Sequence, residues 1–136
     1  YTDEWRVTSL IRGIGIDIIE IRRISEAISR KSFVNRVFTA NEQQYCDSRG
    51  VQKAASYAAR FAAKEAVMKA LGTGLAEGTW QDVEVTVDTA GKPSVQLTGF
   101  FAAKAHELGA ANIYISLSHT KEYAVAQAIL EGDGTL

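Results

Sequence analysis

Apolar residues recur at near-helical spacing between positions 51 and 71. Tyr57, Phe61, Met68 and Leu71 fall on one stripe, which is the pattern of an amphipathic helix. Many alanines in the same segment would let a sheet or another helix approach closely. Glycines follow directly at positions 72 and 74 and are typical of a helix end. The pattern predicts one long helix from about Val51 to Leu71.

The rest of the chain alternates between short strand and helix patterns. Gly13 to Ile21 carries isoleucine on both alternating faces, as expected of a strand buried on two sides. Thr39 followed by Glu42 three residues later forms a capping box, which predicts a short helix. The other predicted elements are a helix over 22–31, a hairpin of strands over 80–89 and 94–98, a helix over 99–108, and strands over 112–118 and 123–130. This order predicts a single α+β domain with a mainly antiparallel sheet, one long helix and several short ones.

Composition sets the limits of this domain. A chain of 136 residues, 46% of them hydrophobic and 23% charged, suits one globular domain. We expect residues 11–130 to form it, with 1–10 a mobile extension that lacks the plan of a signal peptide and 131–136 a frayed tail. A net charge of −1 draws the molecule neither to nucleic acid nor to a membrane, and the sequence has no apolar run of membrane-spanning length. A single cysteine, Cys46, excludes an internal disulfide and agrees with a cytoplasmic location.

Two carboxylates interrupt these apolar patterns. Asp17 lies inside the isoleucine-rich strand, and Glu65 lies in the apolar stripe of the long helix, where a carboxylate is costly to bury. If strand and helix pack together, the two acids converge, and a cation relieves their repulsion. Two oxygen ligands with open water positions suit Mg²⁺. Taken alone, Glu65 is better explained by a surface ion pair with Lys69 or Lys64, and the case for a metal depends on Asp17.

Basic residues and a histidine surround this candidate metal site in the sequence. Arg60, Lys64 and Lys69 lie on the same helix as Glu65, and phosphate groups need such cations. Gly72, Thr73 and Gly74 offer open backbone N–H groups that a ligand can approach closely, although a simple helix end explains the same three residues. His119 lies at the end of an apolar strand, where a histidine can donate a hydrogen bond to a phosphate or close a turn. Its neighbour Ser118 points to the opposite face, which argues against a serine–histidine dyad. The glycines at 13 and 15 do not complete a dinucleotide-binding fingerprint.

A second group of basic residues lies on the predicted helix over 22–31. Arg22, Arg23 and Arg30 form a positive cluster there. Such a cluster is as often a solvated face as a functional one. If it is functional, it would dock an acidic partner.

Three segments in this order closely resemble the holo-[acyl-carrier-protein] synthase family of small 4'-phosphopantetheinyl transferases. They are GIGIDIIEI at 13–21, RFAAKEAVMKALGTG at 60–74 and ISLSHTKEYAVAQAI at 115–129. The resemblance runs from about Ile11 to Leu130, and its middle segment is the most specific. It implies the 4'-phosphopantetheinyl transferase fold. It also implies transfer of the phosphopantetheine arm of coenzyme A to a serine of apo acyl carrier protein in fatty acid biosynthesis, with release of adenosine 3',5'-bisphosphate.

Matched residue by residue, the resemblance assigns roles within the chain. It implies that Asp17 and Glu65 are the Mg²⁺ ligands. It implies that Arg60, Lys69, the loop 72–74 and His119 contact coenzyme A. It also implies a homotrimer with active sites at subunit interfaces. Glu65, a metal-bound water and Lys69 all remain candidate bases for the serine hydroxyl. The acidic carrier makes Arg22, Arg23 and Arg30 the expected docking face.

Two other functions fit the same residues. A coenzyme A or nucleotide-binding module without catalysis would use Arg60 and His119 but not need Asp17. An oligomeric structural domain would pair its buried acids internally. Modification of a carrier protein in the presence of coenzyme A and Mg²⁺ separates these alternatives from the transferase.

Overall fold

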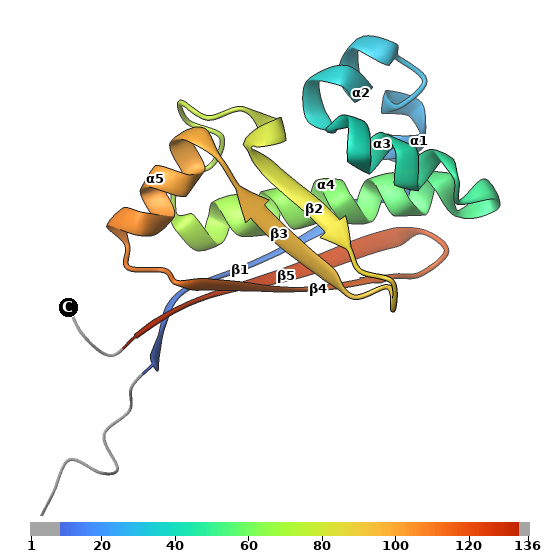
Figure 1. The fold of residues 1–136 in the computed structure, drawn as a ribbon. Coiled ribbons are helices and arrows are strands. Elements are labelled where there is room, and N and C mark those ends of the chain that lie inside the picture. The colour runs from blue at the N-terminus through green and yellow to red at the C-terminus, as the bar shows by residue number, and fades with distance from the viewer. Residues whose placement is uncertain (1–8, 134–136) are drawn as a thin grey trace, which may run out of the picture.

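The computed structural model describes residues 9–133 and builds them around the long helix α4 (Lys53–Leu71). This helix lies across a three-stranded antiparallel sheet of β1 (Ser9–Glu20), β5 (Tyr123–Asp133) and β4 (Asn112–His119), in the order β1-β5-β4 (Figure 1). A separate antiparallel hairpin of β2 (Val83–Val87) and β3 (Pro93–Leu97) flanks α4, with β3 against β4 and α5 (Gly99–Glu107) beside the hairpin. The predicted α+β class with antiparallel pairing is confirmed.

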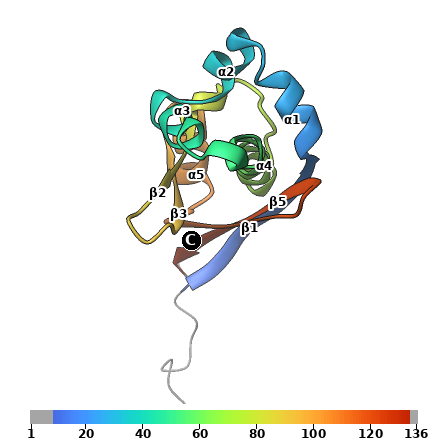
Figure 2. The ribbon, with the colours of Figure 1, turned by 90° about the vertical axis from the view of Figure 1, so that its right-hand side faces the viewer.

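Three short helices cover the first half of α4. They are α1 (Ile21–Ala27), α2 (Lys31–Val37) and α3 (Ala40–Asp47), and a 3-10 turn, η1 (Gly50–Gln52), leads from them into α4. Viewed along its axis, α4 is enclosed by the sheet, the hairpin and these helices (Figure 2). That enclosure explains why fourteen of its nineteen residues are buried and why so many are alanine. No helix among residues 9–133 is long and apolar enough to cross a membrane.

The local signals in the sequence predict most element ends correctly. Gly72 caps α4 in the left-handed region with φ of 77°, as a glycine at a helix end can. Thr39 and Glu42 form both hydrogen bonds of the predicted capping box at the start of α3. The turn at 90–93 joins β2 and β3 as expected, although residues 80–82 form a 3-10 turn, η2 (Trp80–Asp82), before β2 begins.

Three predictions about the elements need correction. The helix expected over 22–31 ends at Ala27, and a new helix starts at Lys31, because the chain turns to bring Val34 and Val37 into the core beside α4. Residues 9–10 and 131–133 belong to β1 and β5 rather than to an extension and a tail; residues 1–8 and 134–136 lie outside the described part. The strand expected to be buried on both faces is covered on one face only.

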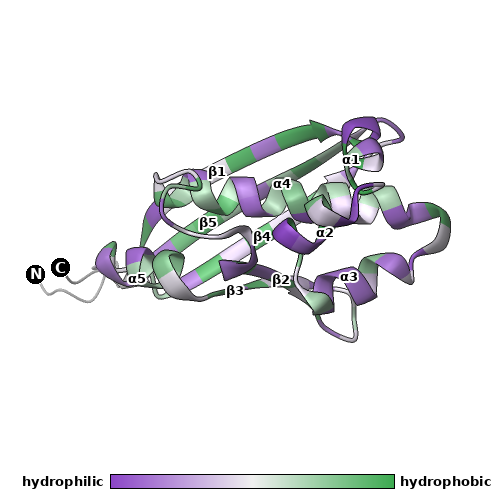
Figure 3. Ribbon diagram, turned by 90° about the horizontal axis from the view of Figure 1, so that it is seen from above, coloured by the Kyte–Doolittle hydropathy of each residue, from purple (hydrophilic) through white to green (hydrophobic). Residues whose placement is uncertain are grey.

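The uncovered face belongs to the sheet. Ile14, Ile16 and Ile18 of β1 are each 60–64% exposed and point away from α4, and β1 is largely hydrophobic along its length (Figure 3). Tyr114 on β4 is also exposed, at 51%. A contiguous apolar surface of this kind marks a site for another protein surface.

Candidate active site

The site begins with the close contact of β1 and α4. Gly13 and Gly15 face the helix, and a Cβ atom built on them would lie 2.1 Å from the carbonyl oxygen of Ala70 and 2.0 Å from that of Ala66. Only glycine on the strand and alanine on the helix allow the two backbones to approach so closely. The glycines at 13 and 15 therefore serve packing, and Asp17, two residues further on, lies on the same face of β1.

Asp17, Glu65 and Lys69 meet where β1 crosses α4. Lys69 Nζ forms an ion pair with Asp17 Oδ1 at 3.0 Å and donates to the carbonyl oxygen of Ile16 at 3.0 Å. Burial raises the pKa of Glu65, the nearby charge of Asp17 raises it further, and Lys69 opposes the shift. The structure thus brings the two predicted carboxylates together in one chain, and Lys69 pairs with Asp17 rather than with Glu65.

The loop after α4 lies open beside this cluster. Gly72 and Gly74 both have positive φ, 77° and 58°, and a Cβ atom on either would meet no other atom within 4 Å. Thr73 donates its hydroxyl hydrogen to the carbonyl oxygen of Gly74. The loop therefore leaves space in which a ligand can approach the backbone, as the sequence predicts.

Lys64 is placed differently from the expected phosphate contact. Its side chain is fully buried and forms an ion pair with Glu42 at 2.9 Å. Its Nζ also donates to the carbonyl oxygens of Trp80 and Val83. Burial lowers the pKa of Lys64, and the Glu42 carboxylate opposes this shift. Lys64 thus joins α4 to α3 and β2, and its side chain is fully buried, which does not suit the predicted contact with phosphate.

Arg60 and His119 line a different part of the surface. Both border a cavity of about 490 Å³ between α3, the first half of α4, the β2–β3 turn and the edge of β4. Arg49 and Lys92 line it as well. Arg60 itself is only 6% exposed. Four basic groups around one cavity make it suited to an anionic ligand.

The carboxylate cluster and the arginine cavity lie on opposite sides of α4. Arg60 and Lys69 are nine residues apart, which is about two and a half helical turns. Lys69 contacts β1, whereas Arg60 shares its cavity with β4, at the other edge of the three-stranded sheet. A ligand that touches both groups in one chain would have to pass around α4 and the sheet. The two halves of the predicted site are therefore separated within the subunit.

The predicted docking residues are all exposed. Arg22 lies on α1 and forms an ion pair with Glu26 at 3.4 Å, with both side chains mostly in solvent. Arg23 lies next to it, and Arg30 precedes α2. Lys31 and Arg36 of α2 are exposed as well. Arg22, Arg23 and Arg30 are thus accessible, and their docking role stays a prediction.

Comparison with known proteins identifies the family. The model of the 4'-phosphopantetheinyl transferase superfamily matches residues 13–128. The chain belongs to this superfamily. It is 51% identical over 118 residues to the holo-[acyl-carrier-protein] synthase of Moorella thermoacetica, covering 86% of this chain and 91% of that one. It is 48% identical over 120 residues to that of Ruminiclostridium cellulolyticum, covering 86% and 90%.

A solved structure of a relative has the same fold as this chain. The crystal structure of a holo-(acyl-carrier-protein) synthase from Bacillus anthracis, in complex with CoA (3',5'-ADP), superposes with a TM-score of 0.75 at 40% identity, over 90% of this chain and 97% of that one. The resemblance found in the sequence is confirmed, and the chain is an enzyme of the transferase class.

Two features of the site have little signal in the sequence. Glu42 is recognised as a capping residue, yet its carboxylate also accepts hydrogen bonds from the N–H of Val85 and from Lys64. Nothing local indicates that it would be buried. The sequence likewise gives no sign of the role of Tyr45, whose ring lies against two arginines. Glu42 contacts Lys64 and Val85, and Tyr45 contacts Arg60, so these contacts join residues that are distant in sequence.

Proposed function

We propose that this enzyme transfers the 4'-phosphopantetheine arm of coenzyme A to a serine of apo acyl carrier protein and serves fatty acid biosynthesis. The serine oxygen attacks the phosphorus that carries the pantetheine arm, and a new O–P bond forms. The pyrophosphate bond breaks, adenosine 3',5'-bisphosphate leaves, and the serine proton passes to a base. The observation that carries the proposal is the meeting of Asp17, Glu65 and Lys69 at the glycine-lined contact of β1 with α4.

Asp17 and Glu65 fit a magnesium site. Burial is the main cause of the raised pKa of Glu65, and the charge of Asp17 adds to it; a divalent cation would relieve that repulsion. Within residues 9–133 no group of three or more His, Cys, Asp or Glu side chains is arranged for a metal. Two carboxylates that leave the remaining positions to water and phosphate oxygens are the arrangement Mg²⁺ favours. Bound there, Mg²⁺ would supply charge neutralisation for the pyrophosphate.

Lys69 would stabilise the leaving phosphate. Its side chain is 52% exposed, so the ammonium group can turn from Asp17 to an incoming phosphate oxygen without leaving a buried site. Its positive charge offsets the charge that develops as the pyrophosphate bond breaks. The open loop 72–74 leaves room for the nucleotide next to it.

The separation of the two half-sites supports a homotrimer with active sites between subunits. One subunit would provide Asp17, Glu65 and Lys69, and its neighbour would provide Arg60 and His119. The exposed isoleucines of β1 give such an assembly an apolar surface to bury. An interface that joins the β1 side of one copy to the β4 side of the next is heterologous, and it forms a closed ring when the rotation between copies closes.

A direct assay tests the activity. The enzyme is incubated with coenzyme A, Mg²⁺ and apo acyl carrier protein, and the intact mass of the carrier is measured. We expect a gain of one phosphopantetheine arm, which is lost on chelation of the metal and in Asp17→Ala and Glu65→Ala. An unmodified carrier with coenzyme A still bound to the enzyme would favour the binding module.

A mixing experiment tests the shared site. Asp17→Ala and Arg60→Ala are unfolded together in equal amounts, refolded, and assayed at coenzyme A concentrations well below KM. If sites form between subunits, about one quarter of them receive both intact halves, and activity rises above that of either parent. Activity equal to the mean of the two parents would place the whole site in one subunit.

A further inference from the structure

The arginine cavity contains an unusual arrangement around Tyr45. The guanidinium carbon of Arg60 lies 4.5 Å from the centre of the Tyr45 ring, and that of Arg49 lies 5.3 Å from it. All three residues line the same cavity of about 490 Å³. One aromatic ring therefore contacts two of the cations that face the expected ligand.

Arg60 depends on this ring because its burial is otherwise poorly compensated. It is 6% exposed, and its Nη1 donates to the carbonyl oxygen of Ser56 at 3.3 Å. Among residues 9–133, no carboxylate forms an ion pair with Arg60 or Arg49. A buried guanidinium without a carboxylate is costly, and the face of an aromatic ring offsets part of that cost. An anionic ligand would offset the rest.

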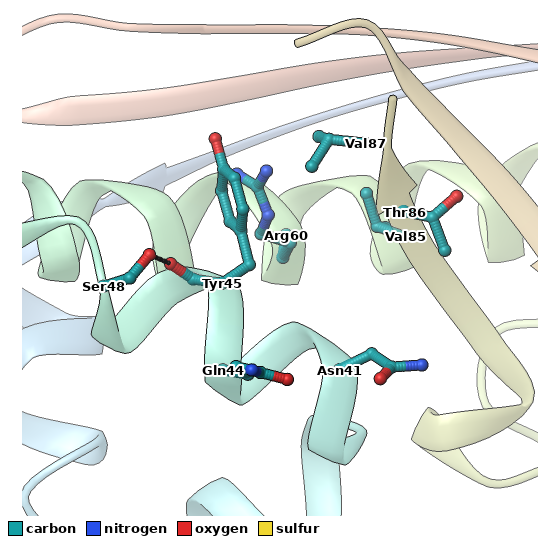
Figure 4. A pocket seen from close by; sticks show the side chains of 8 residues that line it. All are labelled: Asn41, Gln44, Tyr45, Ser48, Arg60, Val85, Thr86 and Val87. Atoms are coloured by element: carbon teal, nitrogen blue, oxygen red, sulfur yellow. Dashed lines mark hydrogen bonds between the residues drawn. The ribbon is translucent and has the colours of Figure 1, made fainter. Parts of the chain in front are cut away.

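The ring is held by its own helix. Glu42 fixes α3 in place, because its carboxylate accepts hydrogen bonds from the N–H groups of Thr39 and Val85 and pairs with Lys64 of α4. Tyr45 lies three residues further on, nearly one turn later. Figure 4 shows its ring rising from α3 beside the Arg60 side chain, with Val87 of β2 nearby. The buried contacts of Glu42 therefore fix the helix that carries the ring.

We propose that Tyr45 is a positioning residue that holds Arg60 and Arg49 ready for a phosphate group of coenzyme A. The proposal rests on the proposed function, since coenzyme A is the anionic ligand it assumes. The Tyr45 hydroxyl is not required; the flat ring is. Without the ring, Arg60 would lose its fixed direction, and two neighbouring guanidinium groups would repel each other across the empty cavity.

Steady-state kinetics of ring variants test the proposal. In Tyr45→Leu we expect KM for coenzyme A to rise about 5- to 30-fold, the equivalent of a partly desolvated cation–π contact, while kcat stays within about twofold. Tyr45→Phe keeps the ring and should stay within about threefold of wild type in KM. Ser32→Leu, an exposed change on α2, is the control.

A double-mutant cycle shows whether Tyr45 acts through Arg60. In an Arg60→Gln background, Tyr45→Leu should raise KM by clearly less than it does in the wild-type enzyme, because only Arg49 is left for the ring to position. Fully additive effects, or an unchanged KM in Tyr45→Leu, would overturn the proposal. A wild-type enzyme that neither binds coenzyme A nor modifies the carrier would instead refute the proposed function.

A measurement on the unaltered enzyme covers the case in which Tyr45→Leu does not fold. Relaxation of the Arg60 Nε–H group by nitrogen-15 NMR, without ligand, should report an ordered side chain. The exposed Arg22 provides the comparison, since its guanidinium is mostly in solvent. An Arg60 group as mobile as that of Arg22 would refute positioning by the ring.

Discussion

Replacing Lys64 by methionine tests whether Lys64 stabilises the fold or binds the ligand. Lys64 and Glu42 are both 0% exposed in their side chains and lie 2.9 Å apart. The Lys64→Met change keeps the length of the chain but leaves the Glu42 carboxylate buried without its cation. Removing one partner of a buried pair costs about 3–5 kcal/mol in the free energy of unfolding. That is a large part of the roughly 5–15 kcal/mol that stabilises a domain.

A second substitution, added to Lys64→Met, tests the same reasoning, because we expect it to restore stability rather than to reduce it further. Glu42→Gln removes the remaining buried charge, and the amide oxygen can still accept from the N–H of Val85 or Thr39. We therefore expect the double variant to be more stable than Lys64→Met alone, by about 1–3 kcal/mol. Ordinary loss of packing would make the second change destabilising as well.

Urea unfolding at fixed protein concentration and neutral pH measures these differences, because an oligomer's stability depends on concentration. Lys69→Met is the matched control: it lies on the same helix, but its side chain is 52% exposed, so its cost should be within about 1 kcal/mol. In folded Lys64→Met at low temperature, KM for coenzyme A should stay within about threefold of wild type. A stable Lys64→Met variant with KM raised more than tenfold would show that Lys64 contacts the ligand after all.

Three further changes test other parts of the site. The fold raises the pKa of Glu65, so the metal-free protein loses stability as pH rises through that pKa and Glu65 becomes charged. Glu65→Gln should therefore raise Tm at pH 7 in the presence of a chelator. This gain should vanish at a pH below 4.5, the ordinary pKa of a glutamate side chain. Gly15→Ala places a Cβ atom 2.0 Å from the Ala66 carbonyl oxygen; it should cost about 1–3 kcal/mol in urea unfolding and lower kcat by moving Asp17. Arg23→Glu should raise KM for the carrier about tenfold at low salt and leave KM for coenzyme A unchanged; an unaltered carrier KM would place docking elsewhere.

Local chemistry made much of this fold predictable. The left-handed glycine at 72, the capping box of Thr39 and the hairpin turn at 90–93 each depend on a few neighbouring residues, and each is found in the structure. The convergence of Asp17 and Glu65 was also predictable, because each acid interrupts an otherwise apolar pattern. What decides their contact, the close approach of β1 to α4, was visible only as two glycines and a row of alanines.

Long-range pairing explains the features that the sequence did not predict. Lys64 looks like the other cations of its helix, and only the fold shows that Glu42, twenty-two residues earlier, is buried against it. The break between α1 and α2 likewise depends on tertiary packing, since Val34 and Val37 lie in a core cluster with Tyr57 of α4. In both cases the deciding contact joins segments that no local pattern connects.

The isoleucines of β1 join the sequence pattern to the proposed assembly. Isoleucine on both faces predicts a strand buried on two sides, yet the isolated chain buries only the face toward α4 and leaves Ile14, Ile16 and Ile18 at least 60% exposed. A second protein surface removes this conflict. Asp17 lies on the other face of the same strand, and β1 is an edge strand of the sheet, so a subunit that covers the isoleucines reaches the carboxylate cluster only around that free edge. A charged substitution such as Ile16→Asp should therefore reduce both the mass of the assembly and its activity, whereas a monomer that retains full activity would show that the site is complete in one chain.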